Sequence, residues 1–93
     1  MHYVYVYVLF SVKDRQLYVG LTDDLRRRWC QHRTGMVRST RDRRPLKLIY
    51  YEAYLTRIEA ARRERYLKGG NGRAALKKQL DVTFSRLGYR HLD

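Results

Sequence analysis

Apolar and aromatic residues fill residues 3–10, with tyrosines and a leucine at the odd positions and valines and a phenylalanine at the even ones. This alternation predicts a strand, and because both of its faces are apolar, we expect it at the centre of a sheet. A polar run with a turn near Lys13 and Asp14 follows, and residues 17–21 form the return strand of a hairpin. A similar run over residues 46–54 predicts a third strand.

The position of the turn determines which side chains of the hairpin meet. With the turn centred on Lys13 and Asp14, Tyr7 lies opposite Gly20, and Tyr18 is the diagonal neighbour of Tyr7 on the same face. A shift of one residue would place the two tyrosines on opposite faces, so this expectation depends on the register. Gly20 has no side chain and is expected to leave open space beside Tyr7.

The residues after the hairpin predict a helix that ends at Gly35, a typical C-terminal cap. Thr22 or Asp23 is expected to cap its N-terminus. Leu25 and Trp29 are four residues apart, and we expect them to anchor this helix to the sheet.

Two more helices are expected after the third strand. The sequence from Thr56 to Glu59 is a capping box, which starts a helix that runs to Gly69. The glycine-rich residues 69–72 predict a sharp turn, and residues 73–80 predict the last helix.

The predicted fold class is α/β, of the α+β kind, with a three-stranded antiparallel sheet flanked by about three helices. The length leaves room for one core, so residues 1–93 are expected to form a single domain. Residues 36–44 are predicted to be a basic loop that is either a mobile connector or a contact to a phosphate backbone. Residues 82–93 are predicted to be a loosely packed C-terminal tail.

The net charge restricts the possible functions more than any other feature of the composition. The chain carries 21 Lys and Arg against 9 Asp and Glu, a net charge of +12, and 16 of the basic residues are arginine. Arginine suits two-point binding of phosphate, and the excess is larger than solubility requires. We therefore expect a nucleic acid as partner, with an acidic membrane surface or an acidic protein as the alternatives.

Several other kinds of chemistry are not expected. A single cysteine, Cys30, excludes an internal disulfide and a cysteine-based zinc site. The histidines His2, His32 and His91 show no zinc spacing. The apolar start of the chain is interpreted as a strand rather than a signal peptide, and no run approaches the roughly 18 apolar residues of a membrane span. We expect a cytoplasmic protein.

The residues that remain for catalysis are tyrosine, arginine, histidine and one glutamate. Arg28 and His32 lie one turn apart, beside the apolar stripe of the first helix. Glu64 falls on the apolar side of its helix, where a carboxylate needs a partner; that partner is either Lys68 at i+4 or a functional site. Phosphodiester hydrolysis needs an activated water, positive charge on the phosphoryl oxygens and stabilisation of the leaving oxygen, which such residues and a metal ion could supply.

Two short motifs, Tyr5-Val6-Tyr7 and Tyr18-Val19-Gly20, place their shared tyrosines eleven residues apart, and Arg28 follows ten residues after the second. His32 comes one turn later, and Glu64 lies in a later helix. In these residues the chain resembles the GIY-YIG endonucleases, specifically their small stand-alone members, over residues 3–78. A tyrosine stands in the first motif where the family has its name-giving glycine.

The resemblance implies a role for each matched residue. Glu64 would hold Mg²⁺ or Mn²⁺, with water and phosphate oxygens completing its coordination. Tyr7 would be the general base, and Tyr18 would position water or phosphate. Arg28 would neutralise the phosphate, and His32 would orient Tyr7 or assist proton transfer.

The sequence therefore predicts a metal-dependent endonuclease that hydrolyses DNA phosphodiester bonds, directed by DNA structure in repair or processing; RNA is the other candidate substrate. One alternative is a noncatalytic nucleic-acid-binding module with the same fold and basic face, and another is an interaction module for an acidic partner. The complete set of matched residues favours the enzyme, while the oligomeric state stays open. The basic residues expected to contact nucleic acid are Arg26, Arg27, Arg33, Arg38, Arg41, Arg43, Arg44, Lys68 and Arg73.

Overall fold

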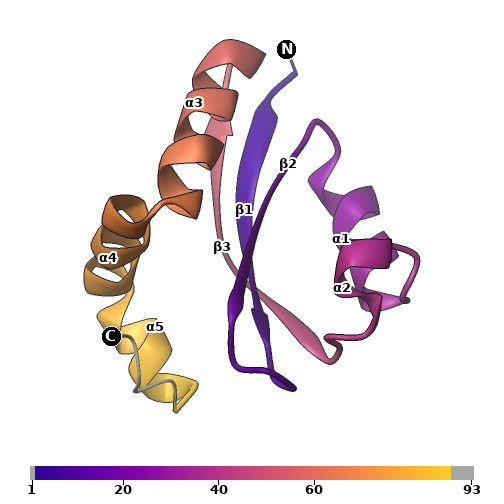
Figure 1. The fold of residues 1–93 in the computed structure, drawn as a ribbon. Helices are drawn as coiled ribbons and strands as arrows, with labels where there is room; N and C mark the ends of the chain where they lie inside the picture. Colours follow the sequence, from indigo (N-terminus) through magenta and orange to yellow (C-terminus); the bar gives the residue numbers. More distant parts are fainter. Residues whose placement is uncertain (1, 89–93) are drawn as a thin grey trace.

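A computed structural model describes residues 2–88. Its strands form one antiparallel sheet in the order β2-β1-β3, which confirms the predicted sheet and its central first strand. Within residues 2–88, no helix is long and apolar enough to cross a membrane. The elements (Figure 1) are β1 (Val4–Ser11), β2 (Leu17–Thr22), α1 (Leu25–Arg33), α2 (Arg38–Arg41), β3 (Leu46–Tyr54), α3 (Arg57–Lys68), α4 (Gly70–Gln79) and α5 (Asp81–Arg86).

The pairing of β1 with β2 has the predicted register. Tyr7 pairs with Gly20 and Leu9 pairs with Tyr18, so Tyr18 is the diagonal neighbour of Tyr7 on one face of the sheet. The space beside Gly20 is not open, however. A β-carbon at Gly20 would lie 2.3 Å from both Cζ and Oη of Tyr7, so the Tyr7 ring fills the position itself.

The sheet separates two layers of helices, which lie on either side of it in Figure 1. On one face, Val6, Val8 and Phe10 of β1 are buried beneath α3, α4 and α5. On the other face, Tyr7 and Leu9 are buried, and Leu25 and Trp29 of α1 pack against them. The expected anchoring of α1 by these two residues is therefore confirmed.

The predicted N-terminal cap of α1 is wrong by one or two positions. Asp24 is the cap, and its side chain accepts a hydrogen bond from the backbone N–H of Arg27. Thr22 instead accepts from the N–H of Asp24, which holds the turn before the helix. At the other end Gly35 has a φ of +83°, so the predicted glycine after the helix is confirmed.

The predicted loop over residues 36–44 contains the short helix α2. Thr40 in this helix is completely buried, although its neighbours are polar and basic. The guanidinium of Arg43 pairs with Asp14 in the hairpin turn, and this contact holds the pKa of Asp14 below its usual value. The C-terminal part of the segment is therefore fixed against the hairpin.

The glycine-rich residues 69–72 do not form the predicted turn, because α4 already begins at Gly70. A β-carbon at Gly72 would lie 1.9 Å from the carbonyl oxygen of Tyr66, so glycine at this position permits the close approach of α4 to the end of α3. The capping box is confirmed: Thr56 caps α3 and accepts from the N–H of Glu59.

The prediction of a loosely packed tail is wrong where the structure describes it. Residues Asp81–Arg86 form α5, and Phe84 is 1 % exposed in the core beneath the sheet. Residues 89–93 of the predicted tail lie outside the described part of the chain. With α5 and α2, the described residues form five helices where about three were expected. Short helices held by tertiary contacts leave little local signal.

A polar network joins β3 to α3. Glu52 accepts hydrogen bonds from the hydroxyls of Tyr50 (2.6 Å) and Tyr54 (2.7 Å) and pairs with Arg63 (2.9 Å). Burial by itself would raise the pKa of Glu52, but the hydrogen bonds from Arg63 and the two tyrosines hold it below its usual 4.5. The ionised carboxylate is thus favoured in the folded state, and it contributes to attachment of α3.

This network makes stability depend on pH. Because the pKa of Glu52 is lower in the folded state, its contribution is fully present above about pH 4.5 and is lost as the pH falls through the folded pKa. We expect Glu52→Gln to reduce the free energy of unfolding by about 2 kcal/mol at pH 7 and to flatten its decrease between pH 5 and 3. Urea denaturation over this pH range measures both effects.

The control is Asp23→Asn, which removes an exposed carboxylate outside the network. It should leave the acid dependence of stability unchanged. Equal acid dependence in the wild type and in Glu52→Gln would contradict the role given to the Glu52 carboxylate.

Candidate active site

Three aromatic rings from three elements meet on the α1 side of the hairpin. The ring centroids of Tyr7 (β1) and His32 (α1) are 5.5 Å apart, and those of Tyr18 (β2) and His32 are 5.2 Å apart, both in edge-on arrangements. The rings of Tyr7 and Tyr18 are 6.4 Å apart. The structure therefore brings together the two tyrosines and the histidine that the sequence indicated.

A chain of two hydrogen bonds runs from the hairpin to α2. The hydroxyl of Tyr7 is 2.8 Å from Nε2 of His32, and Nδ1 of His32 is 2.7 Å from the hydroxyl of Thr40. Tyr7 is 2 % exposed, and His32 and Thr40 are fully buried. Sequence reasoning missed Thr40, because nothing in its local pattern distinguishes it from the neighbouring polar residues.

Burial determines where the protons of this chain lie. It raises the pKa of Tyr7 to about 12, although the hydrogen bond and positive charge of Arg28 act in the opposite direction. It lowers the pKa of His32 to about 4, and the charge of Arg28 adds to this effect. At neutral pH both groups are uncharged, so we assign the Tyr7 hydroxyl as donor to Nε2 and Nδ1–H as donor to Thr40.

Arg28 reaches the same cluster from α1, one turn before His32. Its guanidinium acts on the Tyr7 phenol, whose pKa it lowers, and its Nη1 donates to Oε1 of Gln31 at 3.1 Å. The side chain is half-buried, so the guanidinium combines a fixed position with access from solvent. Positive charge held in this way can neutralise a phosphate.

Glu64 comes from α3, in the layer on the other side of the sheet. Its Oε2 is 3.1 Å from Nζ of Lys68, which is the i+4 ion pair that the sequence left open. Its charge also contributes to raising the pKa of Tyr7, so the carboxylate lies within electrostatic range of the hairpin cluster. Glu64 is therefore both the ion-pair partner of Lys68 and an electrostatic neighbour of Tyr7.

The donors available for a metal ion are few. Within residues 2–88, no group of three or more His, Cys, Asp or Glu side chains could hold an ion. Glu64 offers a hard carboxylate oxygen as a ligand, and 24 % of its side chain is exposed. Mg²⁺ is commonly bound through one or two carboxylates, with water and substrate phosphate as its other ligands. The donor set therefore fits such an ion, which would have to replace the Lys68 ammonium beside Oε2.

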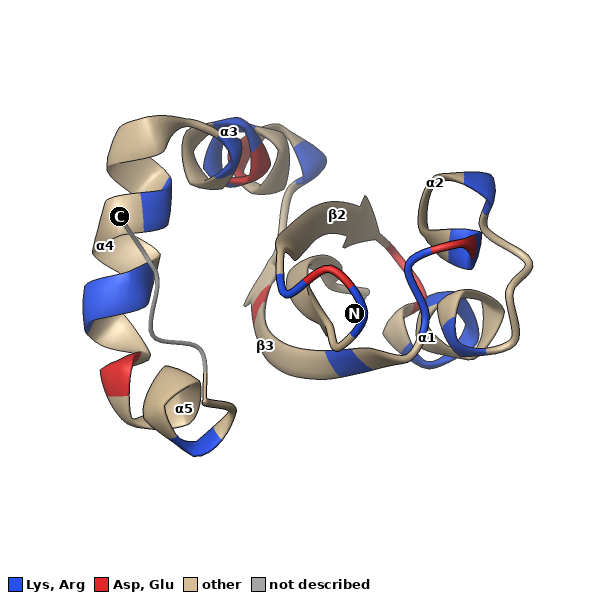
Figure 2. Cartoon of the chain, turned by 60° about the horizontal axis from the view of Figure 1, so that its bottom comes forward, with Lys and Arg blue, Asp and Glu red and all other residues tan. Residues whose placement is uncertain are grey.

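The basic residues predicted to contact nucleic acid lie in both helical layers (Figure 2). Arg73 is half-buried and donates to the carbonyl of Lys68, and Arg43 is engaged with Asp14. The side chains of the others are exposed: Arg26, Arg27 and Arg33 on α1, Arg38 and Arg41 on α2, Arg44 after it, and Lys68 on α3.

The family model of the GIY-YIG catalytic domain matches residues 3–79. The chain belongs to the GIY-YIG family. This assignment agrees with the geometry, because the matched segment contains every member of the cluster described above. GIY-YIG proteins form an endonuclease superfamily that acts on nucleic acid and generally uses divalent metal ions.

Relatives within the family carry the designation UPF0213, which states no reaction. One from Clostridium perfringens is 43% identical over 65 residues, covering 69% of each chain. One from Streptococcus agalactiae is 42% identical over 73 residues, covering 77% of this chain and 82% of its own. The solution NMR structure of a UPF0213 protein from Bacillus halodurans has 33% identity, covers 85% of both chains and superposes with a TM-score of 0.53.

The position of the Tyr7 ring can be tested through Gly20. In Gly20→Ala the new methyl group would lie 2.3 Å from the buried phenol and would displace it. We expect the free energy of unfolding to fall by about 1–3 kcal/mol, as for other overpacked cores. Urea denaturation measures this change.

Gly70→Ala is a matched control, because a β-carbon at Gly70 meets nothing within 4 Å. It lies in the first turn of α4 and should leave stability unchanged or raise it by about 0.4–1 kcal/mol. Similar effects of the two substitutions would contradict the packing of Tyr7 against Gly20.

Proposed function

We propose that this protein is a metal-dependent endonuclease that hydrolyses phosphodiester bonds in DNA, with Tyr7, Tyr18, Arg28, His32 and Glu64 as its catalytic residues. The observation that carries the proposal is the buried hydrogen bond between Tyr7 and His32, with the charge of Arg28 acting on the same phenol. A protein that only bound nucleic acid would need the positive charge but not this arrangement. Family membership supports the reaction class.

Arg28 and Tyr18 are proposed to bind the scissile phosphate. The Arg28 guanidinium donates to a non-bridging oxygen and stabilises the charge that develops on it. Tyr18 is half-buried beside Tyr7, so its hydroxyl can orient the phosphate or the attacking water. Both side chains come from elements that the Tyr7–His32 contact holds together.

Tyr7 and His32 are proposed to move the proton. The attacking water gives a proton to the Tyr7 oxygen while Tyr7 passes its own to Nε2 of His32, 2.8 Å away. The bond from phosphorus to the leaving oxygen breaks as the bond from the water oxygen to phosphorus forms, and the leaving oxygen takes a proton from solvent. Since the pKa of His32 is about 4, it holds the proton only briefly and returns it to solvent.

Glu64 is proposed to hold the divalent ion. When bound, Mg²⁺ or Mn²⁺ supplies positive charge that stabilises the phosphoryl oxygens and lowers the pKa of a nearby phenol. In the free protein, the charge of Glu64 acts on Tyr7 in the opposite direction and helps to keep it protonated. Glu64 thus influences the proposed base in both states.

The ion pair of Glu64 with Lys68 leads to a test of the metal site. We expect Glu64→Ala to reduce plasmid nicking with Mg²⁺ or Mn²⁺ by at least about 100-fold. Lys68→Ala removes the ammonium that competes for Oε2, so half-maximal nicking should need less metal. A metal titration of nicking for the wild type and both variants measures this.

Equal nicking by wild type and Glu64→Ala would contradict the assignment of Glu64. Absence of nicking by the wild type, together with binding that weakens steeply with salt, would favour the noncatalytic nucleic-acid-binding module. DNA binding without divalent ions serves as the control for Glu64→Ala, which should bind at least as tightly as the wild type.

Thr40 is proposed to be a positioning residue that acts through His32. In Thr40→Val the Nδ1–H of His32 loses its acceptor, so the tautomer that accepts the Tyr7 proton is no longer favoured. We expect nicking to fall about 10-fold or more while DNA affinity stays unchanged. Thr40→Ser keeps the hydroxyl and should restore most of the activity. Equal activity of the Val and Ser variants would contradict this role.

A further inference from the structure

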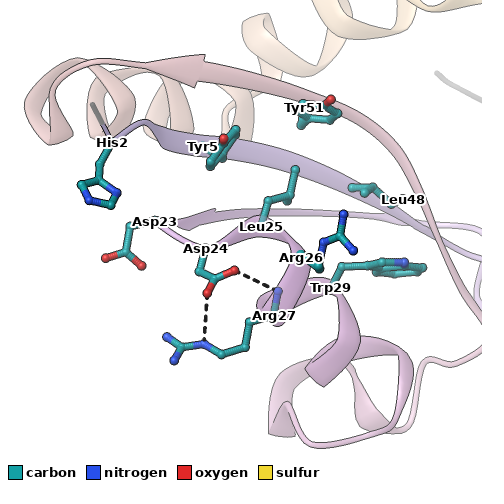
Figure 3. A pocket seen from close by; sticks show the side chains of 10 residues that line it. All are labelled: His2, Tyr5, Asp23, Asp24, Leu25, Arg26, Arg27, Trp29, Leu48 and Tyr51. Carbon is teal, nitrogen blue, oxygen red and sulfur yellow. Dashed lines mark hydrogen bonds and ion pairs between the residues drawn. The ribbon is translucent and has the colours of Figure 1, made fainter.

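A groove of about 1100 Å³ runs along the side of α1 that faces β3 (Figure 3). Tyr5 of β1 and Tyr51 of β3 line it from the sheet, and Arg26 and Trp29 line it from α1. None of the five candidate catalytic residues is among those that line the groove. The groove is therefore a separate surface that lies next to the candidate active site.

Three tyrosine rings form a continuous row over this face of the sheet. The ring centroids of Tyr3 and Tyr5 are 6.4 Å apart, and those of Tyr5 and Tyr51 are 6.0 Å apart in an edge-on contact. Tyr3 is 43% exposed and Tyr51 is 54% exposed. The core on this side is closed by other residues, so these rings lie beyond it and present aromatic surface to solvent.

The charges around the groove favour bases over phosphates in its interior. Asp23 and Asp24 lie at one end, where they would repel a phosphate but could accept hydrogen bonds from the amino groups of bases. Arg27 lies close to Asp24, at 3.8 Å, whereas Arg26 extends along the groove beside Trp29 in Figure 3. Arg26 is thus placed to contact a backbone phosphate at the edge.

We propose that this groove, together with Tyr3 beside it, binds unpaired nucleotides, with bases stacked on the row Tyr3–Tyr5–Tyr51 and a phosphate held by Arg26. In duplex DNA the bases stack on one another and offer no free face to these rings. Each base–aromatic stack contributes about 1–3 kcal/mol to binding of single strands, with little sequence preference. The strongly basic surface supplies the general attraction for the backbone.

The groove is physically connected to the candidate active site. Trp29 and Leu48 line the groove, and both pack against the buried cluster that contains Tyr7. If the chain is the endonuclease proposed above, on which this step rests, its substrate contains a single-stranded segment beside the cleaved bond. The substrate class would then be branched, flapped or frayed nucleic acid rather than continuous duplex.

Binding can be measured apart from cleavage by use of the Glu64→Ala protein with EDTA. A single-stranded oligonucleotide and a duplex of the same sequence are compared by fluorescence anisotropy at one salt concentration. Trp29 is the only tryptophan in the chain, so quenching of its emission reports directly on the groove. We expect tighter binding of the single strand, with quenching by the single strand alone.

Substitutions of the exposed rings then test the stacking surface. Tyr51→Ala and Tyr3→Ala should each weaken single-strand binding about 5- to 100-fold and change duplex binding less than about twofold. Tyr51→Phe keeps the ring and should bind like the parent. Tyr66→Ala is the matched control, because Tyr66 is 44% exposed but lies on α3 in the other layer.

The proposal is overturned if Tyr51→Ala and Tyr3→Ala weaken single-strand binding no more than Tyr66→Ala, or if duplex binding weakens equally. A failure of the nuclease proposal can be distinguished from a failure of this one. In that case the protein would not nick DNA but would still bind single strands selectively. Nicking of duplex plasmid without selective single-strand binding would support the nuclease proposal and would contradict only the proposal that the groove binds single strands.

Discussion

The hydrogen bond between Tyr7 and His32 joins the hairpin to α1, and the rest of this face depends on it. The phenol reaches His32 only because Gly20 on the paired strand has no side chain to block it. His32 is in turn held by Thr40, so the position of α2 affects the geometry of the tyrosine. The hairpin, α1 and α2 together therefore fix the position of the Tyr7 hydroxyl oxygen.

Burial of this pair has an electrostatic consequence. Burial raises the pKa of Tyr7 to about 12 and lowers the pKa of His32 to about 4. The proton therefore remains on the phenol over the whole neutral range. Arg28 lowers the pKa of Tyr7, while the charge of Glu64 raises it. A cation bound by Glu64 would cancel the second effect. In the proposed mechanism, metal binding and activation of the base are thus one event, because both act through the same carboxylate.

Local pattern and register predicted the hairpin and one side of the site well. The alternation along β1 and the short polar turn determine that Tyr7 faces Gly20 and that Tyr18 lies diagonally from it, and both are properties of neighbouring residues. Thr40 and Gly72 were not predictable in the same way. Thr40 acquires its role only from the packing of α2 against His32. Gly72 is predicted to lie in a turn, whereas it lies within α4, where the close contact with Tyr66 requires glycine. Glu64 was predictable only in part. The local sequence predicts its helix, but the position of Glu64 relative to Tyr7 depends on how that helix packs against the sheet.

Tyrosine has three distinct uses in this chain, and position relative to the sheet decides among them. On the face toward α3, the hydroxyls of Tyr50 and Tyr54 donate to Glu52, and these two residues contribute to stability. On the face toward α1, burial under the helix raises the pKa of Tyr7, and its hydroxyl is hydrogen-bonded to His32. Where α1 no longer covers that same face, Tyr51 keeps its ring exposed. Since α1 covers only part of the sheet, one face holds both a buried proton donor and an open aromatic surface.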